Sequence, residues 1–462
     1  MSASDGVKHL RWIVTTEDAA WQEREPLTAA APASLPDVFL QLDTPAQEIE
    51  GFGTAFNEMG WTSLAHLRPE ERTEILHEMF APGVGGNFTM GRMPIGANDF
   101  SRDWYSYDET PGDFALDHFS IANDHETLVP FIKAAQAHQP DLALWASPWS
   151  PPSWMKTNGH YAAALPGSAI GHVENGLEPH QVGHEGTDMF NLSEPYLRAY
   201  ANYFGKFVDA YAEQGITIGM VMPQNEFNSA QVFPSCTWTP KGLAAFLRHL
   251  GPVMHERDVA VFLGTLERAN AALVDEVLAD PDAAAALSGL GVQWHGKGAV
   301  RQLHREHPDL PIYQSEQECG DGRNDWRYAR YSWALMRTFL NDGASAYLYW
   351  NLSLEEGGVS RWGWSQNSLV VVDAESATYR YTHEYQVLKH VSHFVSPGAR
   401  LLPTLSYTGF ENQVAFRNPD GSIVVVMQND TGQDQTVGIL LGDQVVNPTL
   451  PADSFSTFVF DV

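Results

Sequence analysis

Three features are scarce in this sequence: cysteine, long apolar runs and basic side chains. The chain contains two cysteines, Cys236 and Cys319, too few for a disulfide framework, so we expect two free thiols. No apolar run approaches the roughly 18 residues of a membrane-spanning helix, which excludes a membrane span. The chain has 27 Lys and Arg against 57 Asp and Glu, a formal charge of −30. An acidic protein repels polyphosphate, so neither nucleic acid nor an anionic membrane is an expected partner.

What remains is the composition of a soluble enzyme large enough to build its own core. The 462 residues are 44% hydrophobic and only 18% charged. Such a chain does not need a disulfide or a structural metal for stability. Residues 1–22 lack a continuous apolar stretch and a small-residue cleavage site, so we expect no signal peptide and a cytoplasmic location. Nothing in the sequence indicates the oligomeric state.

Strand-like and helix-like segments alternate from about residue 48 to residue 395. The predicted strands read as apolar on both faces, which is typical of parallel strands buried beneath helices. They are residues 48–56, 87–96, 142–150, 216–226, 259–267, 290–296, 310–318 and 344–354. Helical patterns separate them at 68–80, 124–138, 193–215, 239–250, 268–287, 299–306, 324–343 and 381–395. Eight strands alternating with eight helices predict an α/β protein, a (β/α)8 TIM barrel.

Both ends of the chain differ from this central pattern. After about residue 396 short strands follow one another without helices, and residues 15–45 also read as strand and loop. We therefore expect a side antiparallel β-sandwich domain built from both termini: residues 1–47 and 396–462 around a barrel of residues 48–395. The long connection 157–190, rich in Gly and His, suggests a rim over the active site.

Two glutamates stand at the ends of predicted strands. Glu226 ends the fourth strand, in the sequence MPQNEF, and Glu316 ends the seventh, in IYQSEQECG. In a barrel both would lie at the C-terminal face, where reactive groups collect, and they could converge across its mouth. Two carboxyl groups flanking a glycosidic bond are the minimum equipment for its hydrolysis. Glu318 shares the face of Glu316 by strand alternation, so periodicity leaves the choice between them open.

Aromatic side chains gather at the same ends of the strands. Trp149, Trp154, Trp294 and Trp350 all fall at or just past a predicted strand end. Indole rings pack on the C–H faces of sugars, while neighbouring polar groups bind the hydroxyls. The alternative is that these rings only seal the top of the barrel.

With these residues assembled, the chain resembles glycoside hydrolase family 30, the glucosylceramidase-type retaining enzymes. The motifs that carry the resemblance are EGFGTAFNE, RMPIGANDFS, ASPWSPPSWMKTNG, QNE, SEQECG and YWNLSLEEGG. The resemblance spans about residues 48–395 and implies a retaining β-glycosidase that acts on a neutral β-linked sugar, without a metal or other cofactor. Glucosidase, glucosylceramidase, xylosidase, fucosidase and β-1,6-glucanase activities all stay open.

The resemblance also assigns roles, position by position. It makes Glu226 the acid/base and selects Glu316, rather than Glu318, as the nucleophile. Asn225 would contact the sugar 2-hydroxyl. The other positions that match substrate-binding residues are Arg92, Asp99, Trp149, Trp350 and Asn367.

Two positions depart from the family pattern. Phe227 replaces the usual proline after the acid/base, and His295 stands where glucosylceramidases have a tyrosine. We expect His295 either to hydrogen-bond Glu316 or to contact a different substrate.

Two other classes of function stay open at this point. One is a barrel that binds glycans without cutting them. The other is a metal-dependent barrel hydrolase, which the four histidines of the long loop suggest: His160, His172, His180 and His184. However, the first strand carries no His-x-His pair and no helix carries a His-Glu-x-x-His motif, so we expect no metal site.

Overall fold

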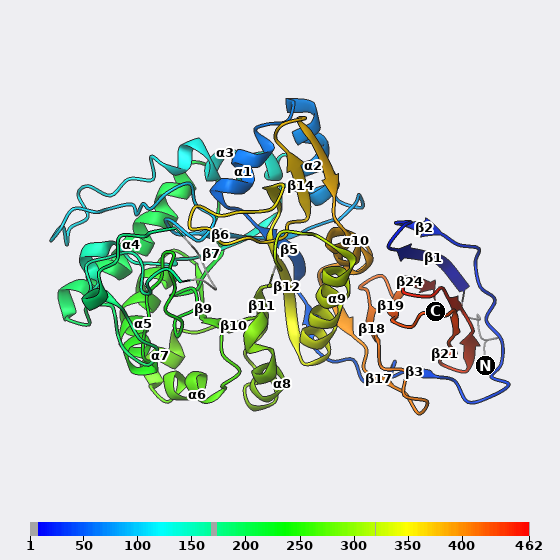
Figure 1. The fold of residues 1–462 in the computed structure, drawn as a ribbon. Helices are drawn as coiled ribbons and strands as arrows, with labels where there is room; N and C mark the ends of the chain where they lie inside the picture. Colours follow the sequence, from blue (N-terminus) through cyan, green and yellow to red (C-terminus); the bar gives the residue numbers. More distant parts are fainter. Residues whose placement is uncertain (1–7, 168–172, 319, 462) are drawn as a thin grey trace.

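Eight parallel strands close into a barrel, where the sequence predicts them (Figure 1). The computed structural model describes residues 8–167, 173–318 and 320–461. The barrel strands are β5 (Gly51–Ala55), β6 (Met90–Pro94), β7 (Ala143–Ser147), β8 (Met220–Val221), β9 (Ala260–Leu266), β10 (Gly289–Gln293), β11 (Ile312–Glu316) and β12 (Ala344–Asn351). β12 pairs in parallel with β5 and so closes the ring. β8 is much shorter than predicted; Pro223, which has no N–H to donate to a ladder, follows just after it.

The helices surround the barrel and follow the predicted order. They are α1 (Glu58–Leu64), α2 (Pro69–Phe80), α3 (Leu128–Gln136), α4 (Glu194–Glu213), α5 (Pro240–His255), α6 (Ala272–Leu278), α7 (Pro281–Ala285), α8 (Lys297–Glu306), α9 (Trp326–Asn341) and α10 (His383–Ser392). Local sequence sets their ends. The Thr239 hydroxyl accepts a 2.9 Å hydrogen bond from the Gly242 amide and caps α5. Gly215, with φ of 74°, follows the end of α4.

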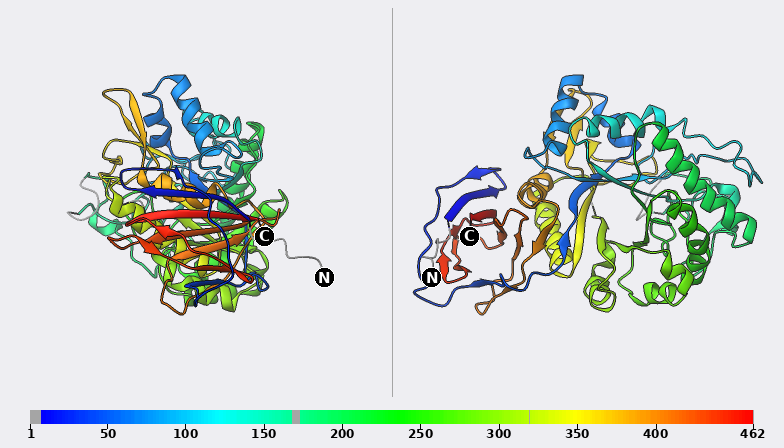
Figure 2. Two further views of the ribbon diagram at one scale, coloured as in Figure 1. Left: turned by 90° about the vertical axis from the view of Figure 1, so that its right-hand side faces the viewer. Right: turned by 180° about the vertical axis from the view of Figure 1, so that it is seen from behind.

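Both ends of the chain meet in a side domain of β-strands (Figures 1 and 2). Its larger sheet has the order β2-β1-β24-β19-β18-β16-β4, and a smaller one has the order β17-β3-β21-β22. Their strands are β1 (Lys8–Thr16), β2 (Gln22–Glu23), β3 (Val38–Leu40), β4 (Glu48–Ile49), β16 (Ala399–Leu401), β17 (Thr404–Leu405), β18 (Gln413–Arg417), β19 (Ile423–Asn429), β21 (Ile439–Leu441), β22 (Gln444–Val446) and β24 (Ser454–Asp461). The short pair β20 (Gln435–Thr436) and β23 (Thr449–Leu450) completes it. Its pairings are antiparallel, except that β3 and β21 run parallel.

The predicted strand 48–56 serves two domains. β4 pairs with β16 of the side domain, and β5 begins two residues later in the barrel. A small sheet not predicted from the sequence follows β12: β13 (Ser353–Glu355), β14 (Val370–Asp373) and β15 (Thr378–Tyr381). Sequence periodicity did not separate β13 from β12, because one residue alone lies between them.

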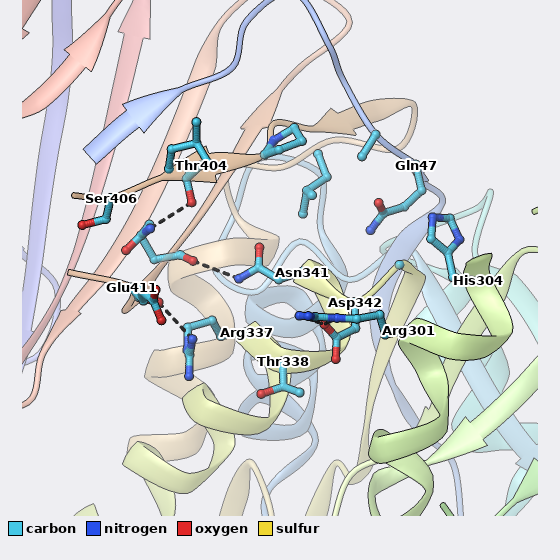
Figure 3. A pocket seen from close by; sticks show the side chains of 16 residues that line it. Gln47, Arg301, His304, Arg337, Thr338, Asn341, Asp342, Thr404, Ser406 and Glu411 are labelled. Atoms are coloured by element: carbon cyan, nitrogen blue, oxygen red, sulfur yellow. Dashed lines mark hydrogen bonds and ion pairs between the residues drawn. The ribbon is translucent and has the colours of Figure 1, made fainter. Parts of the chain in front are cut away.

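The side domain is attached to α9 and α10 by specific hydrogen bonds. Buried His390 of α10 contacts the hydroxyls of Thr15 and Thr457, which come from opposite ends of the chain, at 2.8 and 2.7 Å. A pocket of about 570 Å³ lies at the same junction (Figure 3). Inside it the Asn341 side chain donates to the Gln413 carbonyl at 3.2 Å. The pocket is lined by residues of α8, α9 and the side domain, and none of the predicted site residues is among them. It is therefore a feature of the domain junction.

The inside of the barrel has two unlike ends. At the N-terminal ends of the strands an apolar cluster fills it: Met90, Trp145, Met220, Met222, Phe262, Tyr313, Ala346 and Leu348. Two residues further along three of these strands come Arg92, Ser147 and Trp350. Side chains two residues apart on a strand share a face, so the barrel lining changes from apolar to polar within one step. No helix among the described residues is long and apolar enough to cross a membrane.

Candidate active site at the barrel mouth

Glu316 and Glu226 both lie at the C-terminal ends of barrel strands. Glu316 is the last residue of β11, and Glu226 follows β8 by five positions. Because the strands are parallel and the ring is closed, both carboxyl groups belong to the same mouth. The topology therefore places both glutamates at the same end of the barrel.

Arg92 lies between the two glutamates: it pairs with Glu316 and hydrogen-bonds Asn225, the residue before Glu226. Its side chain is fully buried, and one Nη1 donates to Glu316 Oε2 at 2.5 Å. Its Nη2 donates to Asn225 Oδ1 at 2.7 Å and to the Ser147 hydroxyl at 3.0 Å. A buried guanidinium is costly to desolvate unless it is paired, and Glu316 supplies that pair. Arg92 thus connects the end of β11 with the residue preceding Glu226.

Asn225 has its side-chain orientation set by three donors. Arg92 Nη2, Gln293 Nε2 at 2.8 Å and the Thr265 hydroxyl at 3.2 Å all converge on Asn225 Oδ1. Three donors on one oxygen leave the Nδ2 amide on the opposite side. Gln293 Nε2 also donates to Glu316 Oε2 at 3.1 Å, so one amide links Glu316 to the neighbour of Glu226.

Glu226 has an unusual backbone and a raised pKa. Its φ of 47° lies in the left-handed region, which non-glycine residues seldom adopt, and its amide donates to the Thr265 hydroxyl at 2.8 Å. Gln231 Nε2 donates to Glu226 Oε2 at 3.1 Å. Burial, and then the charge of Glu316, raise the Glu226 pKa to about 7, against smaller lowering effects of Gln231 and Arg92. Glu226 is thus set to carry a proton near neutral pH.

Glu316 and Asp99 complete a group of three carboxyls around one cation. Burial raises the pKa of Glu316, and its ion pair and hydrogen bond with Arg92 oppose that rise. Burial, followed by the charges of Glu316 and Glu226, raises the pKa of Asp99 well above its usual value. One guanidinium balances one carboxylate, and the contacts of Arg92 select Glu316 as the ionised member.

The two predicted tryptophans pack on Arg92. Trp149 and Trp350 stack with ring centroids 5.0 Å apart, and the Arg92 guanidinium lies 4.5 and 5.3 Å from their respective centroids. Both side chains are about 1% exposed. They therefore pack around the arginine and orient it. However, Trp350 Nε1 and Asp99 Oδ1 are buried without a hydrogen-bond partner, and such atoms suit the hydroxyls of a bound ligand.

Asn367 lies in a buried polar network beside the site. Its Nδ2 donates to Glu384 Oε1 at 2.9 Å, and its Oδ1 accepts from the Asn324 amide at 3.1 Å. Glu384 also accepts from the Tyr349 hydroxyl, and burial raises its pKa to about 8. Both the nitrogen and the oxygen of the Asn367 side chain thus have hydrogen-bond partners within the protein.

His295 does not hydrogen-bond Glu316 but Glu267. Its Nδ1 lies 3.0 Å from Glu267 Oε1, and the residue is 51% exposed. The first of the two expectations for His295 is therefore wrong. The reason is that the chain leaves β10 as a 3-10 turn, Trp294–Gly296, which turns His295 towards β9, while Gln293 takes the hydrogen bond to Glu316.

The structure also separates Glu316 from Glu318 and from Glu58, a further carboxyl just past the end of a barrel strand. β11 ends at Glu316, so strand alternation does not extend to Glu318, and Arg92 pairs with Glu316. Glu58 is buried by a hydrogen bond from Asn123 at 2.9 Å and an ion pair with Arg102 at 3.0 Å. Its bonds tie loops together outside the group around Arg92.

Four polar residues of the site were missed in the sequence. Ser147 ends β7, Gln293 ends β10 and Thr265 is the last residue but one of β9, whereas Gln231 lies in the loop after β8. A polar residue ending an otherwise apolar strand is the signal that finds the first three. Gln231 has no such signal. Its backbone carbonyl accepts from the amides of Ala163 and Ala164, both at 2.9 Å, which ties the long loop 157–190 to a side chain that contacts Glu226.

The histidines of that loop form no metal centre in the part of the chain that the structure describes. No group of three or more His, Cys, Asp or Glu side chains converges there, and His172 lies outside the described residues. Cys236 is a buried free thiol, as expected, whereas Cys319 also lies outside the described residues.

A parallel barrel with paired carboxyls at its mouth and a β-sandwich beside it defines a class, the (β/α)8 glycoside hydrolases. The sequence places the chain more narrowly. Residues 49–395 match the description "Glycosyl hydrolase family 30 TIM-barrel domain", and residues 405–458 match "Glycosyl hydrolase family 30 beta sandwich domain". The chain belongs to glycosyl hydrolase family 30, and it is a glycoside hydrolase with a carbohydrate substrate.

Individual relatives agree with this assignment. Lysosomal acid glucosylceramidase of Mus musculus is 28% identical over 86% of this chain and 77% of its own length. Endo-1,6-beta-D-glucanase of Neurospora crassa is 26% identical over 89% of this chain and 87% of its own length.

Solved structures show the same fold. SrfJ from Salmonella typhimurium superposes with a TM-score of 0.86 at 23% identity, over 97% of this chain and 98% of that one. The endo-beta1,6-glucanase BT3312 gives a TM-score of 0.82 at 21% identity, over 97% and 99%. The predicted barrel with a β-sandwich, and the predicted enzyme class, are confirmed.

Proposed function

We propose that this protein is a retaining β-glycosidase in which Glu316 is the nucleophile and Glu226 the acid/base. The observation that carries the proposal is the pairing of Arg92 with Glu316, which keeps that carboxylate ionised, while Glu226 holds a proton up to a pKa of about 7. Hydrolysis of a glycoside needs one carboxyl in each of these states.

In the first step Glu316 attacks the anomeric carbon. The glycosidic C–O bond breaks, its electron pair stays on the leaving oxygen, and that oxygen takes the proton of Glu226. The free alcohol departs and a glycosyl ester of Glu316 remains. Esterification removes the negative charge of Glu316, one of the causes that raise the Glu226 pKa, so Glu226 becomes a better base.

In the second step Glu226 takes a proton from water, and the water oxygen attacks the anomeric carbon. The ester bond breaks, Glu316 regains its negative charge and Glu226 its proton, so the site is restored with the configuration of the sugar retained. Asn225, whose Nδ2 faces away from its three donors, would donate to the 2-hydroxyl of the sugar. Asp99 Oδ1 and Trp350 Nε1 would bind further hydroxyls.

Glucose is the sugar that we propose for the position attacked by Glu316. The names of the two relatives, a glucosylceramidase and an endo-1,6-beta-D-glucanase, both refer to glucose units, and the second also names a β-linkage. A neutral sugar also suits a chain with a formal charge of −30 better than a uronic acid does.

The test uses an aryl β-glucoside with a good leaving group. Glu226→Ala should keep the glycosylation step with 2,4-dinitrophenyl β-glucoside, stall at the ester, and regain turnover with added azide as β-glucosyl azide. Glu316→Ala should not react in this way, because it lacks the nucleophile. Azide rescue that yields the α-azide from Glu226→Ala, or normal turnover by Glu316→Ala, contradicts the assignment.

A further inference from the structure

A cluster of charged and aromatic side chains lies one step beyond the residues that hold the catalytic pair. Thr265 and Gln293 touch Asn225, and two positions further along the chain in each case come Glu267 and His295. These two are joined by a 3.0 Å contact between His295 Nδ1 and Glu267 Oε1. The step from the first pair to the second leads out of the barrel, towards the open mouth.

Arg268 joins this pair to the long loop. It forms ion pairs with Glu267 and with Glu185, which belongs to the 157–190 connection. Arg268 is 33% exposed and Glu185 48%, whereas Glu267 is nearly buried at 8%. The cluster is thus anchored at Glu267 and presents its other charged groups to the solvent of the mouth.

Two rings complete the cluster. Trp294 stacks with His295 at a centroid distance of 5.0 Å and an interplanar angle of 13°. The imidazole lies on the indole with one face and contacts Glu267 through Nδ1, and its side chain is still 51% exposed. We call Glu185, Glu267, Arg268, Trp294 and His295 the leaving-group wall.

Arg268 places its part of the wall on the side of Glu226. Glu226 donates its amide to Thr265, which is three residues before Arg268, and the charge of Arg268 contributes to lowering the Glu226 pKa. The acid must reach the glycosidic oxygen, so the departing group occupies the Glu226 side of the cleaved bond. The departing group therefore lies against this wall.

Such a wall suits one kind of leaving group. Covering half-exposed charges with alkyl chains removes their water without replacing its hydrogen bonds, which is unfavourable. Sugar hydroxyls can bind the carboxylates and the guanidinium, and a sugar C–H face can lie on the imidazole. We infer that the leaving group is itself a sugar, so that this enzyme cleaves between sugar units, and that Arg268 and His295 select it. The inference rests on the proposed function.

The experiment compares leaving groups on one glycone. Purified full-length enzyme is assayed for kcat/KM with a β-1,6-linked glucose trisaccharide, with 4-nitrophenyl β-glucoside, and with glucosylceramide in mixed micelles. The wild type should cleave the trisaccharide at least ten times more efficiently than glucosylceramide. His295→Phe and Arg268→Met should lower kcat/KM for the trisaccharide at least tenfold, and for the aryl glucoside less than threefold.

Matched controls exist elsewhere on the chain. His66 is 40% exposed and pairs with Glu355 at the same 3.0 Å, and Arg301 of α8 is 79% exposed and pairs with Asp342. His66→Phe and Arg301→Met should leave all three rates unchanged. Glucosylceramide as the best substrate, or equal losses on the trisaccharide and the aryl glucoside, overturns the inference and leaves the proposed function standing. Failure of the wild type to cleave any of the three contradicts the proposed function and the inference with it.

Discussion

The two ends of the barrel interior differ in the chemistry of the side chains that line them. At the N-terminal ends of the strands, Met90, Trp145 and Leu348 belong to an apolar cluster. At the C-terminal ends, Arg92 and Glu316 form a buried ion pair with further carboxyls around it. Arg92 is the next inward-facing position after Met90 on β6, whereas Glu316 follows Tyr313 by three residues, past an irregularity in the pairing of β10 with β11.

The difference separates residues that stabilise the fold from residues that act in catalysis. Apolar burial stabilises the fold by about 25 cal/mol per Å². Burying an arginine with three carboxyls adds little to stability or lowers it, because removing each ion from water costs several kcal/mol. We expect substitutions at the two ends to have opposite signatures, on stability at one end and on rate at the other.

The largest expected effect is on catalysis at the mouth. Glu316→Gln removes the nucleophile, and we expect kcat per folded molecule to fall by at least about 10³-fold. The control is Glu50, a carboxyl at the other end that accepts from the Tyr313 hydroxyl. Glu50→Gln should keep full kcat. Loss of activity in Glu50→Gln, or its retention in Glu316→Gln, breaks the division between the ends.

The next effect is on stability at the apolar end. Phe262, 5% exposed, packs on Tyr313 with centroids 4.8 Å apart. Phe262→Ala should lower the free energy of unfolding by about 3–5 kcal/mol, measured by urea denaturation, while kcat per folded molecule changes less than about twofold. A loss of kcat with unchanged stability would contradict the separation.

The division also explains how far the sequence alone led. The strands and helices were predictable because their apolar residues and caps are local, as with Thr239 at the start of α5. Glu226 and Glu316 could be placed at one face because parallel strand ends share it. The contacts among them were not local. Gln293 and Thr265 reach Asn225 from 68 and 40 residues away, and periodicity carries no information on such pairs.

His295 shows the same limit. Its position past a strand end was predicted, but its partner depends on the 3-10 turn that turns it to Glu267. The burial of Trp149 and Trp350 likewise follows from their packing on Arg92, which comes from a third strand.

A smaller effect concerns the pH dependence of the mouth. Activity requires protonated Glu226, whose pKa is about 7, so kcat/KM should fall as pH rises above that value. Gln231 donates to the Glu226 carboxylate and lowers its pKa. Gln231→Met should therefore move the basic limb to higher pH, by up to about one unit.

The control for that shift is Gln302→Met on α8, where the side chain contacts Glu306 at the surface. Its pH–rate profile should match the wild type. A basic limb that stays in place or moves down in Gln231→Met would show that Gln231 does not act on Glu226.

The smallest effect is on stability beside the site. Burial raises the pKa of Glu384 to about 8, so the folded protein prefers the neutral carboxyl. In the unfolded chain the Glu384 carboxyl ionises once the pH passes its ordinary pKa of about 4.5. The wild type therefore loses stability as the pH rises from about 4.5 to about 8. Glu384→Gln keeps an acceptor for Tyr349 and Asn367. Its unfolding temperature should equal the wild type at pH 4 and exceed it at pH 8; a variant less stable at pH 8 contradicts the raised pKa.

The most direct test traps the covalent intermediate. A 2-deoxy-2-fluoro-β-glucoside with a good leaving group slows both steps, and the second step enough for the ester to accumulate. After proteolysis, mass spectrometry should find one fluoroglucosyl unit on the peptide that contains residues 312–318, with fragmentation placing it on Glu316. A label on Glu318 or Glu226, or hydrolysis with inversion and no label, would contradict the account.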